Sequence, residues 1–281
     1  MLLQFSGSLD IPSTLESGQA HRWRKDGQWY HSVIFDNLVR LRSTLEGVEF
    51  NCVPSDEHSF APRLADYLRL QDDLDEIYKS MSVDDFLVQA INQYRGMRIL
   101  RQEPWECLIA FICSANSNIP RISATMEILA DTFGKPLRLE NLRRGTFPTP
   151  QALAEAGEVR LRELKLGFRA KFVAQAAAAV ASGKLDLLPL REASYQDAKD
   201  VLLALPGVGE KVADCVLLFS LDKLEAFPID RWVRRVMEES YLNGEKLSYP
   251  KLREWSLQYF GPYAGYAQQY LFHRRRLQGK E

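Results

Sequence analysis

The two residues best suited to chemistry are Lys211 and Asp230, which lie 19 positions apart in the C-terminal half of the chain. Lys211 follows a glycine-rich segment and is expected about one turn into a helix. The positive end of a helix and partial burial both disfavour the charged ammonium form of a lysine. A lysine that is partly neutral can attack C1′ of a sugar and form a Schiff base. We therefore predict that Lys211 is a nucleophile.

Asp230 ends the segment Pro228-Ile-Asp230 and is expected to be the N-cap of the following helix. A capping carboxylate accepts backbone N–H bonds, which favour its ionised form at neutral pH. Such a carboxylate could stabilise the positive charge that develops as a glycosidic bond breaks. Taken alone, the residue favours a cap that has no part in chemistry.

The segment Leu205-Pro-Gly-Val-Gly209 predicts a tight connection between two helices. The amides at the start of the second helix would point outward and favour an anion such as a DNA phosphate. A phosphate contact of this kind involves no base recognition. An ordinary pair of helices joined by glycines remains the alternative interpretation of this segment alone.

An antiparallel sheet is expected over about the first 55 residues. Asp26-Gly27 is a strong β-hairpin signal, and Asp36-Asn37 predicts a second turn. The expected strands are 20–24, 28–35, 39–42 and 48–53.

From about Ala61 onward the apolar spacing becomes helical. Ser82 and Asp85 resemble a capping box that would begin one of these helices. Further helices are expected at 106–114, 121–133, 150–156, 158–164, 169–182, 194–205, 208–221, 230–241, 251–259 and 263–276. The sequence thus predicts an α+β protein with a small N-terminal sheet and a helical remainder.

The composition argues against several functional classes. The four cysteines and four histidines show no ligand spacing, so no catalytic metal is expected. No apolar stretch reaches the length of a membrane span, and the N-terminus lacks the features of a signal peptide. These features predict an intracellular, cytoplasmic protein without a membrane partner.

A net charge of −1 argues weakly against nucleic-acid binding, but the charges are unevenly distributed. Residues 56–85 are rich in acids, whereas the C-terminal half holds many arginines and lysines. An acidic outer face and a basic working face can coexist in one chain.

Taken together, the hairpin, Lys211 and the Pro228/Asp230 pair resemble the helix-hairpin-helix–Gly/Pro/Asp (HhH-GPD) superfamily of DNA glycosylases. Within it the chain is similar to the 8-oxoguanine DNA glycosylase/AP lyase family along nearly its full length. The segments that carry this resemblance are Ser17–Trp23, Leu100–Pro104, Phe111–Ile119, Leu166–Ala170 and Gly261–Gly265. The resemblance implies a sheet-plus-helix domain over 1–97 and a catalytic domain over 98–281, with its hairpin at about 198–221. The compact length suggests a bacterial or archaeal member.

The resemblance also implies a role for each site residue. Lys211 would displace the base, and Asp230 would stabilise charge and assist proton transfer. A carbonyl of Gly18 would distinguish 8-oxoguanine, whose N7 carries a hydrogen, from guanine, whose N7 is an acceptor. Phe272 and Cys215 would enclose the flipped base, and Gln268 would bond its Watson–Crick edge. Asn116 would fill the space that the base leaves in the stack, and Phe168 would be the wedge beside the orphaned base. Arg121 and Arg169 would bond the orphaned cytosine.

For the DNA backbone, the resemblance implies phosphate contacts at Gly207, Gly209 and position 232. The carbonyls of Leu203, Leu205 and Val208 are candidate ligands of a structural cation, and no other cofactor is implied. The chain departs from the family at Trp232, where animal enzymes carry histidine, at Phe168, where tyrosine is usual, and at Ala115 and Ser117. Trp232 puts the phosphate contact at that position in doubt.

The expected partner is double-stranded DNA with an oxidised guanine opposite cytosine, bound by a monomer. Two alternatives remain open. The first is a glycosylase of the same fold that removes another damaged purine. The second is a non-catalytic helix-hairpin-helix DNA-binding protein, which would need neither Lys211 nor Asp230.

Overall fold

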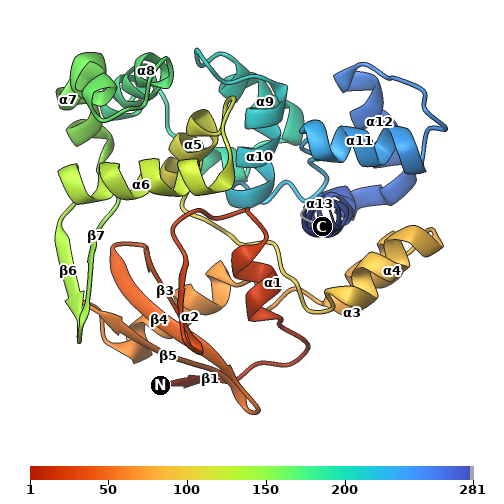
Figure 1. Ribbon diagram of the computed structural model, residues 1–281, viewed down its shortest axis with the longest axis horizontal. Helices are drawn as coiled ribbons and strands as arrows, with labels where there is room; N and C mark the ends of the chain where they lie inside the picture. The colour runs from red at the N-terminus through yellow and green to blue at the C-terminus, as the bar shows by residue number, and fades with distance from the viewer. Residues whose placement is uncertain (279–281) are drawn as a thin grey trace.

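The computed structural model describes residues 1–278 and shows a small sheet at one end of a mostly helical molecule (Figure 1). The strands of the larger sheet pair antiparallel in the order β1-β5-β4-β3-β2. Their bounds are β1 Leu2–Leu3, β2 Arg24–Asp26, β3 Trp29–Ile34, β4 Asn37–Thr44 and β5 Gly47–Val53. This arrangement confirms the predicted α+β class with a small N-terminal antiparallel sheet.

The turns of the sheet follow local sequence signals, with one shift. Asp26 pairs with Trp29 across the predicted Asp26-Gly27 hairpin. The second turn lies at Phe35 and Asp36, whose φ angles are 48° and 58°, one residue earlier than predicted. Asn37 is instead the first residue of β4, and its side-chain amide donates to the Phe35 carbonyl at 2.9 Å.

The prediction of a strand over residues 20–24 is wrong, because only Arg24 enters β2. The chain first forms helix α1 (Ile11–Glu16), which Asp10 caps by accepting the Ser13 amide at 3.1 Å. The fully buried Gln19 side chain then donates to the Arg98 carbonyl and accepts from the Leu100 amide. These long-range bonds hold the segment after α1 outside the β ladder.

The helical part of the molecule begins after β5. Its first helices are α2 Glu57–Tyr67, α3 Leu74–Met81, α4 Asp85–Gln93, α5 Pro104–Cys113, α6 Ile119–Phe133, α7 Pro150–Glu163 and α8 Arg169–Ala181. The remaining helices are α9 Tyr195–Leu203, α10 Glu210–Ser220, α11 Arg231–Ser240, α12 Tyr249–Phe260 and α13 Ala264–Gln278, with short 3₁₀ turns at Leu188–Arg191 and Gly261–Tyr263. Most predicted helices are confirmed within a few residues, and the break predicted between 156 and 158 lies at Gly157, whose φ is 67°.

Three features of this part differ from expectation. Helix α3 and the hairpin of β6 (Pro136–Leu139) and β7 (Leu142–Gly145) were not predicted. The predicted capping box is wrong because Ser82 ends α3, while Asp84 caps α4 by accepting the Leu87 amide at 2.8 Å. The hairpin strands have only four residues each, too few for a clear apolar period, whereas the apolar residues Leu74, Ile77, Tyr78 and Met81 of α3 do follow helical spacing and were overlooked among the surrounding acids.

Two buried clusters of apolar side chains form the core. The smaller one joins α1, the sheet and α2, and it includes Leu100. The larger one joins the remaining helices and includes side chains of α3 and α4, although these helices precede residue 98. The division at residue 98 stays a prediction, and the last three residues of the predicted second domain lie outside the described residues.

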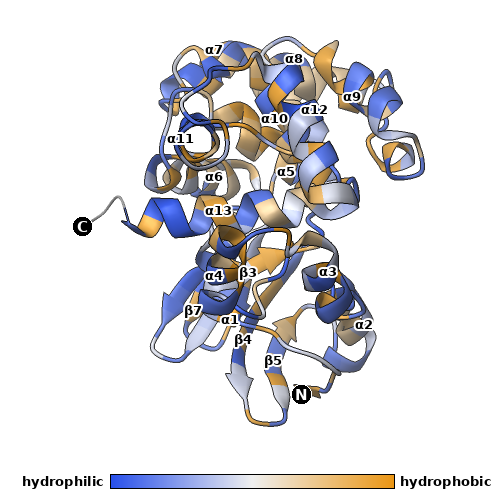
Figure 2. Ribbon diagram, turned by 90° about the vertical axis from the view of Figure 1, so that its right-hand side faces the viewer, coloured by the Kyte–Doolittle hydropathy of each residue, from blue (hydrophilic) through white to orange (hydrophobic). Residues whose placement is uncertain are grey.

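Helices α5 and α10 are buried and mostly apolar on nearly all sides and lie in the middle of the helical body (Figure 2). A helix that is apolar all round belongs in a core rather than on a surface. Only the first residues of α10 therefore reach solvent. Within residues 1–278, no helix combines the length and apolar character needed to span a bilayer.

Buried arginines attach the segment after α1 to the helical body. Arg22 donates to Glu127 of α6 at 2.9 Å and to the Gly145 carbonyl of β7 at 2.6 Å. Arg144 donates to Glu127 at 2.7 Å and to the Arg22 carbonyl at 2.9 Å. Buried guanidinium groups need such partners, and this set holds residues 18–23 against the helices that carry the site.

Candidate active site

Lys211 is the second residue of α10, at the only end of this helix that approaches the surface among the described residues. Its amine donates to the hydroxyl of Ser114 at 3.1 Å and lies 5.0 Å from the centroid of the Phe111 ring. Ser114 follows the last residue of α5, and its hydroxyl donates to the Phe111 carbonyl at 2.6 Å. The end of α5 thus holds the Lys211 amine on an apolar surface.

Asp230 is the N-cap of α11, as predicted. Its carboxylate accepts the amides of Trp232 at 2.9 Å and Val233 at 2.8 Å. Burial raises the pKa of this carboxyl above its ordinary value, while the Val233 amide and the charge of Lys211 act in the opposite direction. The expected cap is confirmed, whereas burial works against the ionised form that the cap favours.

The glycine-rich connection forms a tight hairpin between α9 and α10. Gly207 has a φ of 84°, and the Val208 amide donates to the Leu205 carbonyl at 3.1 Å. Gly209 is the N-cap of α10 and has no side chain to accept the first amides of that helix. These amides therefore form the start of an anion-binding site.

The predicted lesion residues come from three separated segments. Gly18 has a φ of 86°, and a Cβ added to it would lie 2.6 Å from Ile119 and 3.5 Å from Phe272. Gln268 is buried four residues before Phe272 on α13, and its side-chain oxygen has no hydrogen-bond partner within residues 1–278. Cys215 is buried on α10, and burial raises the pKa of its thiol to about 12. Gly18 and Phe272 are therefore neighbours, and Cys215 lies one helical turn from Lys211 on α10.

The predicted opposite-base residues surround the loop between α5 and α6. Asn116 is exposed with a φ of 49°, and Arg121 is exposed in the first turn of α6. Arg169 is buried and donates to the carbonyls of Ala115 and Asn116, each at 2.8 Å. In this DNA-free structure the Arg169 guanidinium thus holds the loop that presents Asn116.

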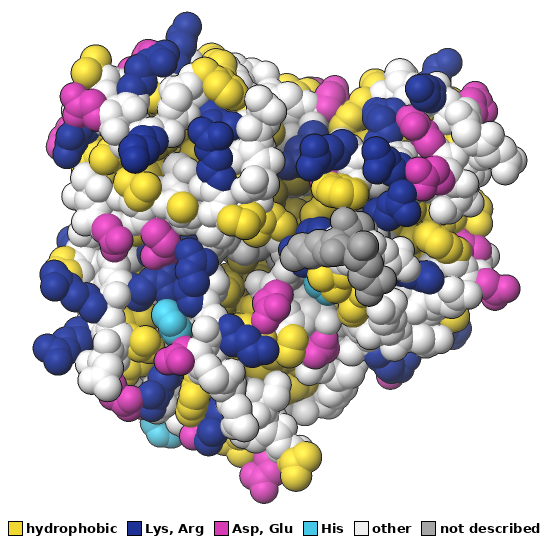
Figure 3. Space-filling model, viewed as in Figure 1, with side chains coloured by type: hydrophobic (Ala, Val, Ile, Leu, Met, Phe, Trp, Pro, Cys, Tyr) yellow, Lys and Arg dark blue, Asp and Glu magenta, His cyan; other side chains and the backbone are white. Residues whose placement is uncertain are grey.

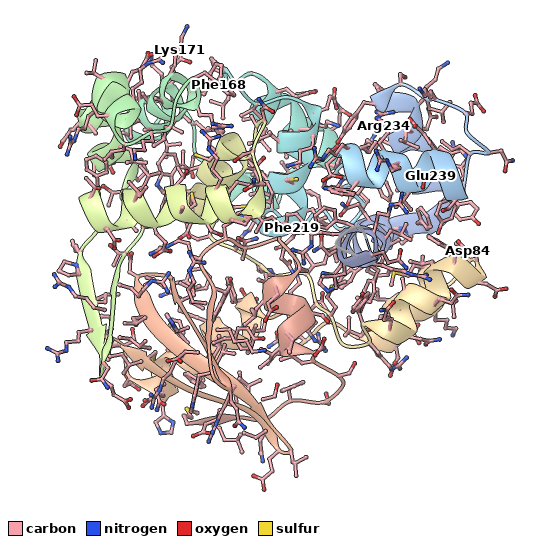
Figure 4. All side chains as sticks on the ribbon, in the orientation of Figure 1. Asp84, Phe168, Lys171, Phe219, Arg234 and Glu239 are labelled. Carbon is pink, nitrogen blue, oxygen red and sulfur yellow. The ribbon has the colours of Figure 1, made fainter. Side chains whose placement is uncertain are left out.

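Phe168 is the exposed aromatic beside this loop. It is 48% exposed and makes an edge contact with Phe172, the side chain that packs against Gly207. The Phe172 ring therefore links Phe168, the predicted wedge, to Gly207 of the hairpin. Figure 4 places Phe168 and Lys171 on α8 and Arg234 on α11, with α9 and α10 between them.

Basic side chains gather on the face that carries these residues. Figure 3 shows lysine and arginine on both sides of a hollow in the upper part of this face, with few acids between them. Trp232 lies at this face, partly exposed, with the guanidinium groups of Arg231 and Arg235 at 5.2 and 6.0 Å from its ring. A locally basic surface is compatible with the net charge of −1.

Three residues beside Lys211 were not assigned roles from the sequence. They are Ser114, Phe111 and His21, although all three fall in segments that carry the family resemblance. His21 is buried edge-on to Phe111 at 5.6 Å, and neither ring nitrogen has a partner among the described residues. Burial and the charge of Lys211 lower the pKa of His21 to about 3. No sequence pattern distinguishes a buried imidazole from an exposed one.

A lysine and a carboxylate at the N-terminal ends of two helices, beside a glycine hairpin and a basic face, define a DNA glycosylase of the helix-hairpin-helix class. Comparison with known proteins agrees with this class. Residues 109–261 match the family described as HhH-GPD superfamily base excision DNA repair protein. Residues 2–108 match the 8-oxoguanine DNA glycosylase N-terminal domain.

Individual relatives resemble the chain along most of its length. The N-glycosylase/DNA lyase OGG1 of Arabidopsis thaliana is 34% identical over 94% of this chain and 76% of its own. The structure of MBOgg1 with a low-affinity DNA ligand superposes with a TM-score of 0.92 at 35% identity, covering 97% of this chain and 94% of that one. The Clostridium acetobutylicum 8-oxoguanine glycosylase/lyase, bound to double-stranded DNA with cytosine opposite 8-oxoG, gives a TM-score of 0.91 at 32% identity, with 97% and 93% covered.

The chain belongs to the 8-oxoguanine DNA glycosylase family of the HhH-GPD superfamily. It is accordingly a base excision repair enzyme with DNA glycosylase and DNA lyase activity.

The hairpin geometry predicts that Gly207→Ala is more harmful than Gly209→Ala. A Cβ at position 207 would lie 2.3 Å from the Phe172 ring, and its φ of 84° is unfavourable for alanine, whereas a Cβ at Gly209 meets nothing within 4 Å. We expect Gly207→Ala to lower the free energy of unfolding by about 1–3 kcal/mol and to weaken DNA binding. Urea denaturation and DNA-binding titrations test this, and equal effects of the two variants would contradict it.

The low pKa of His21 predicts a pH-dependent stability. The unfolded chain takes up a proton near pH 6.5, but the folded protein resists protonation of His21 until about pH 3, so this stability is lost as pH falls through that interval. In His21→Phe, the slope of unfolding free energy against pH should decrease by up to about 1.4 kcal/mol per pH unit between pH 6 and 4. Urea denaturation at several pH values measures the slope. A matched replacement of the exposed His58 should retain the wild-type slope, and an unchanged slope in His21→Phe would contradict the assignment.

Proposed function

We propose that this enzyme removes 8-oxoguanine from double-stranded DNA by base flipping and Schiff-base formation through Lys211, with a preference for cytosine opposite the lesion. The observation that carries the proposal is the position of the Lys211 amine, which Ser114 holds at the N-terminal end of the buried helix α10. Asp230, fixed as the N-cap of α11 by the Trp232 and Val233 amides, is the proposed partner of Lys211.

In the proposed reaction, the neutral Lys211 amine forms a bond to C1′ of the flipped nucleotide. The glycosidic bond breaks, and the base leaves with the bonding electrons and takes up a proton. Asp230 stabilises the positive charge that develops on the sugar. The sugar ring then opens as O4′ gains a proton and the nitrogen loses one, which gives the Schiff base. Loss of a C2′ proton expels the 3′ phosphate, and water hydrolyses the C=N bond and releases the lysine.

The lesion pocket of this proposal contains Gly18, Cys215, Gln268 and Phe272. A carbonyl at Gly18 would accept the N7 hydrogen of 8-oxoguanine, which guanine lacks. Because the buried oxygen of Gln268 has no partner among the described residues, it is a suitable acceptor for the N–H groups of the Watson–Crick edge. The neutral thiol of Cys215 would pack against one face of the base and Phe272 against the other.

The space left by the flipped base would be filled from the loop after α5 and the start of α8. Asn116 and Phe168 are both exposed there, as insertion into the duplex requires. Cytosine offers acceptors at O2 and N3, which suit the guanidinium groups of Arg121 and Arg169. Gly207, Gly209 and Trp232 would contact phosphates, Trp232 through its indole N–H.

A structural cation at the hairpin is a further part of the proposal. Leu203 is the last residue of α9, so its carbonyl belongs to the helix end that lacks intrahelical partners. Such carbonyls, together with those of Leu205 and Val208, suit a cation that supports the phosphate contact. The reaction itself does not require it.

Borohydride trapping tests the nucleophile and the lesion together. With a duplex containing 8-oxoguanine opposite cytosine, the wild-type protein should give a covalent complex, and Lys211→Gln should give none while it still binds the duplex. Lys171→Gln, an exposed lysine on α8, is the control and should be trapped as the wild type is. Trapping of Lys211→Gln would show that the nucleophile is elsewhere.

The other outcomes of this experiment separate the alternatives. Trapping with another damaged purine, but not with 8-oxoguanine, would keep the mechanism and overturn the lesion. Binding without trapping on any lesion would instead favour a glycosylase that uses water alone or a non-catalytic helix-hairpin-helix DNA-binding protein.

The opposite-base assignment predicts a loss of discrimination in Arg121→Ala. Removal of an arginine that reads a base reduces discrimination by about 1–3 kcal/mol, or roughly 5- to 150-fold. Excision rates opposite each of the four bases measure the change. An unchanged preference for cytosine would contradict the role of Arg121, which is exposed and therefore replaceable without damage to the core.

A further inference from the structure

A buried polar cluster lies behind Lys211 and has no role in the function described so far. At its centre Asp214, one turn after Lys211 on α10, is fully buried. Its carboxylate accepts from the hydroxyls of Tyr195 at 2.5 Å and Tyr249 at 2.7 Å, and it pairs with the Lys199 amine at 3.2 Å. A buried carboxylate with this many donors is a well-satisfied group, and removal of one donor leaves the others in place.

The cluster joins the two helices of the hairpin. Lys199 on α9 lies 2.6 Å from Glu210, the residue immediately before Lys211, as well as contacting Asp214. The start of α10 is therefore held to α9 on both sides of Lys211. This arrangement positions the nucleophile relative to the hairpin.

The cluster also reaches the segment that carries Asp230. The hydroxyl of Tyr249, the first residue of α12, accepts the backbone amide of Ile229 at 3.1 Å while it donates to Asp214. Ile229 is buried and directly precedes Asp230. One hydroxyl thus connects the helix of the nucleophile to the backbone of its carboxylate partner.

We infer that Tyr249 is a positioning residue that sets the place of Asp230 relative to Lys211 for base removal. The inference rests on the proposed function, because it assigns Asp230 a part in the reaction. Tyr249 acts through the Ile229 amide and Asp214 and not by contact with the substrate.

The test compares Tyr249→Phe with a matched control elsewhere in the protein. Tyr78 is also buried, and its hydroxyl also accepts a backbone amide, that of Gly96 at 2.8 Å, while it contacts a second polar group, the Tyr270 hydroxyl at 2.9 Å. Tyr78→Phe therefore removes a hydroxyl with similar partners from α3, outside the cluster around Asp214 that reaches Lys211 and Asp230. Thermal melts of both variants monitor the structural cost.

Single-turnover excision of 8-oxoguanine is the first measurement. Tyr249→Phe should reduce the rate of base removal about 10- to 100-fold, because small displacements of reacting groups have effects of this size, while the Kd for the duplex stays within about twofold of wild type. The acidic limb of its pH–rate profile should also move to higher pH, because a displaced Asp230 accepts the Trp232 and Val233 amides less well. Tyr78→Phe should show the wild-type rate and profile.

A double-mutant cycle separates positioning from general damage. In an Asp230→Asn background, Tyr249→Phe should cause no further loss of rate, because there is no carboxylate left to position. A full additional loss in that background, or a Tyr249→Phe rate equal to that of Tyr78→Phe, would overturn the inference. If the wild-type enzyme releases a different damaged base instead of 8-oxoguanine, the proposed lesion fails, and the same cycle on that base still decides the role of Tyr249.

Discussion

The whole site depends on the burial of α10. Because this helix is apolar on nearly every side, it must lie in the core, and only its first turn can meet a ligand. That turn contributes the free amides after Gly209 and the side chain of Lys211. The same constraint thus places free backbone amides and an amine at one end of one helix, within the length of that turn.

The side chains that surround Lys211, the proposed nucleophile, come from other parts of the chain. Ser114 arrives at the end of α5, the other fully apolar helix, and Asp230 arrives at the start of α11. Both are helix ends, where the backbone leaves the core and polar groups are tolerated. The site therefore forms where helix ends meet around α10. The segment after α1 is held beside it by Gln19, which donates to the Arg98 carbonyl before α5, and by Arg22, which donates to Glu127 of α6.

Much of the fold and of the site could be predicted from the sequence, because several features depend on short local patterns. The Asp26-Gly27 hairpin, the glycine connection before Lys211 and the cap at Asp230 each depend on a few adjacent residues. Predictions failed where distant contacts decide the outcome. Residues 20–23 leave the sheet because Gln19 is bonded to Arg98 and Leu100. The buried His21 and the link through Tyr249 were missed for the same reason, since their surroundings come from other elements.

Arg169 shows how one side chain can meet two demands. Its Nε and Nη2 groups donate to the carbonyls of Ala115 and Asn116, which have no helix to satisfy them. Its Nη1 lies 3.5 Å from the Leu166 carbonyl, at the limit of a hydrogen bond. A guanidinium has five N–H donors in a fixed plane, so it can hold the loop and still offer a donor to a base. A lysine at the same place could not do both, because its three donors sit at one point on a flexible stem. The loop that presents Asn116 and a group suited to the opposite base are therefore set by the same residue, and Arg121, exposed on α6, is free of this structural demand.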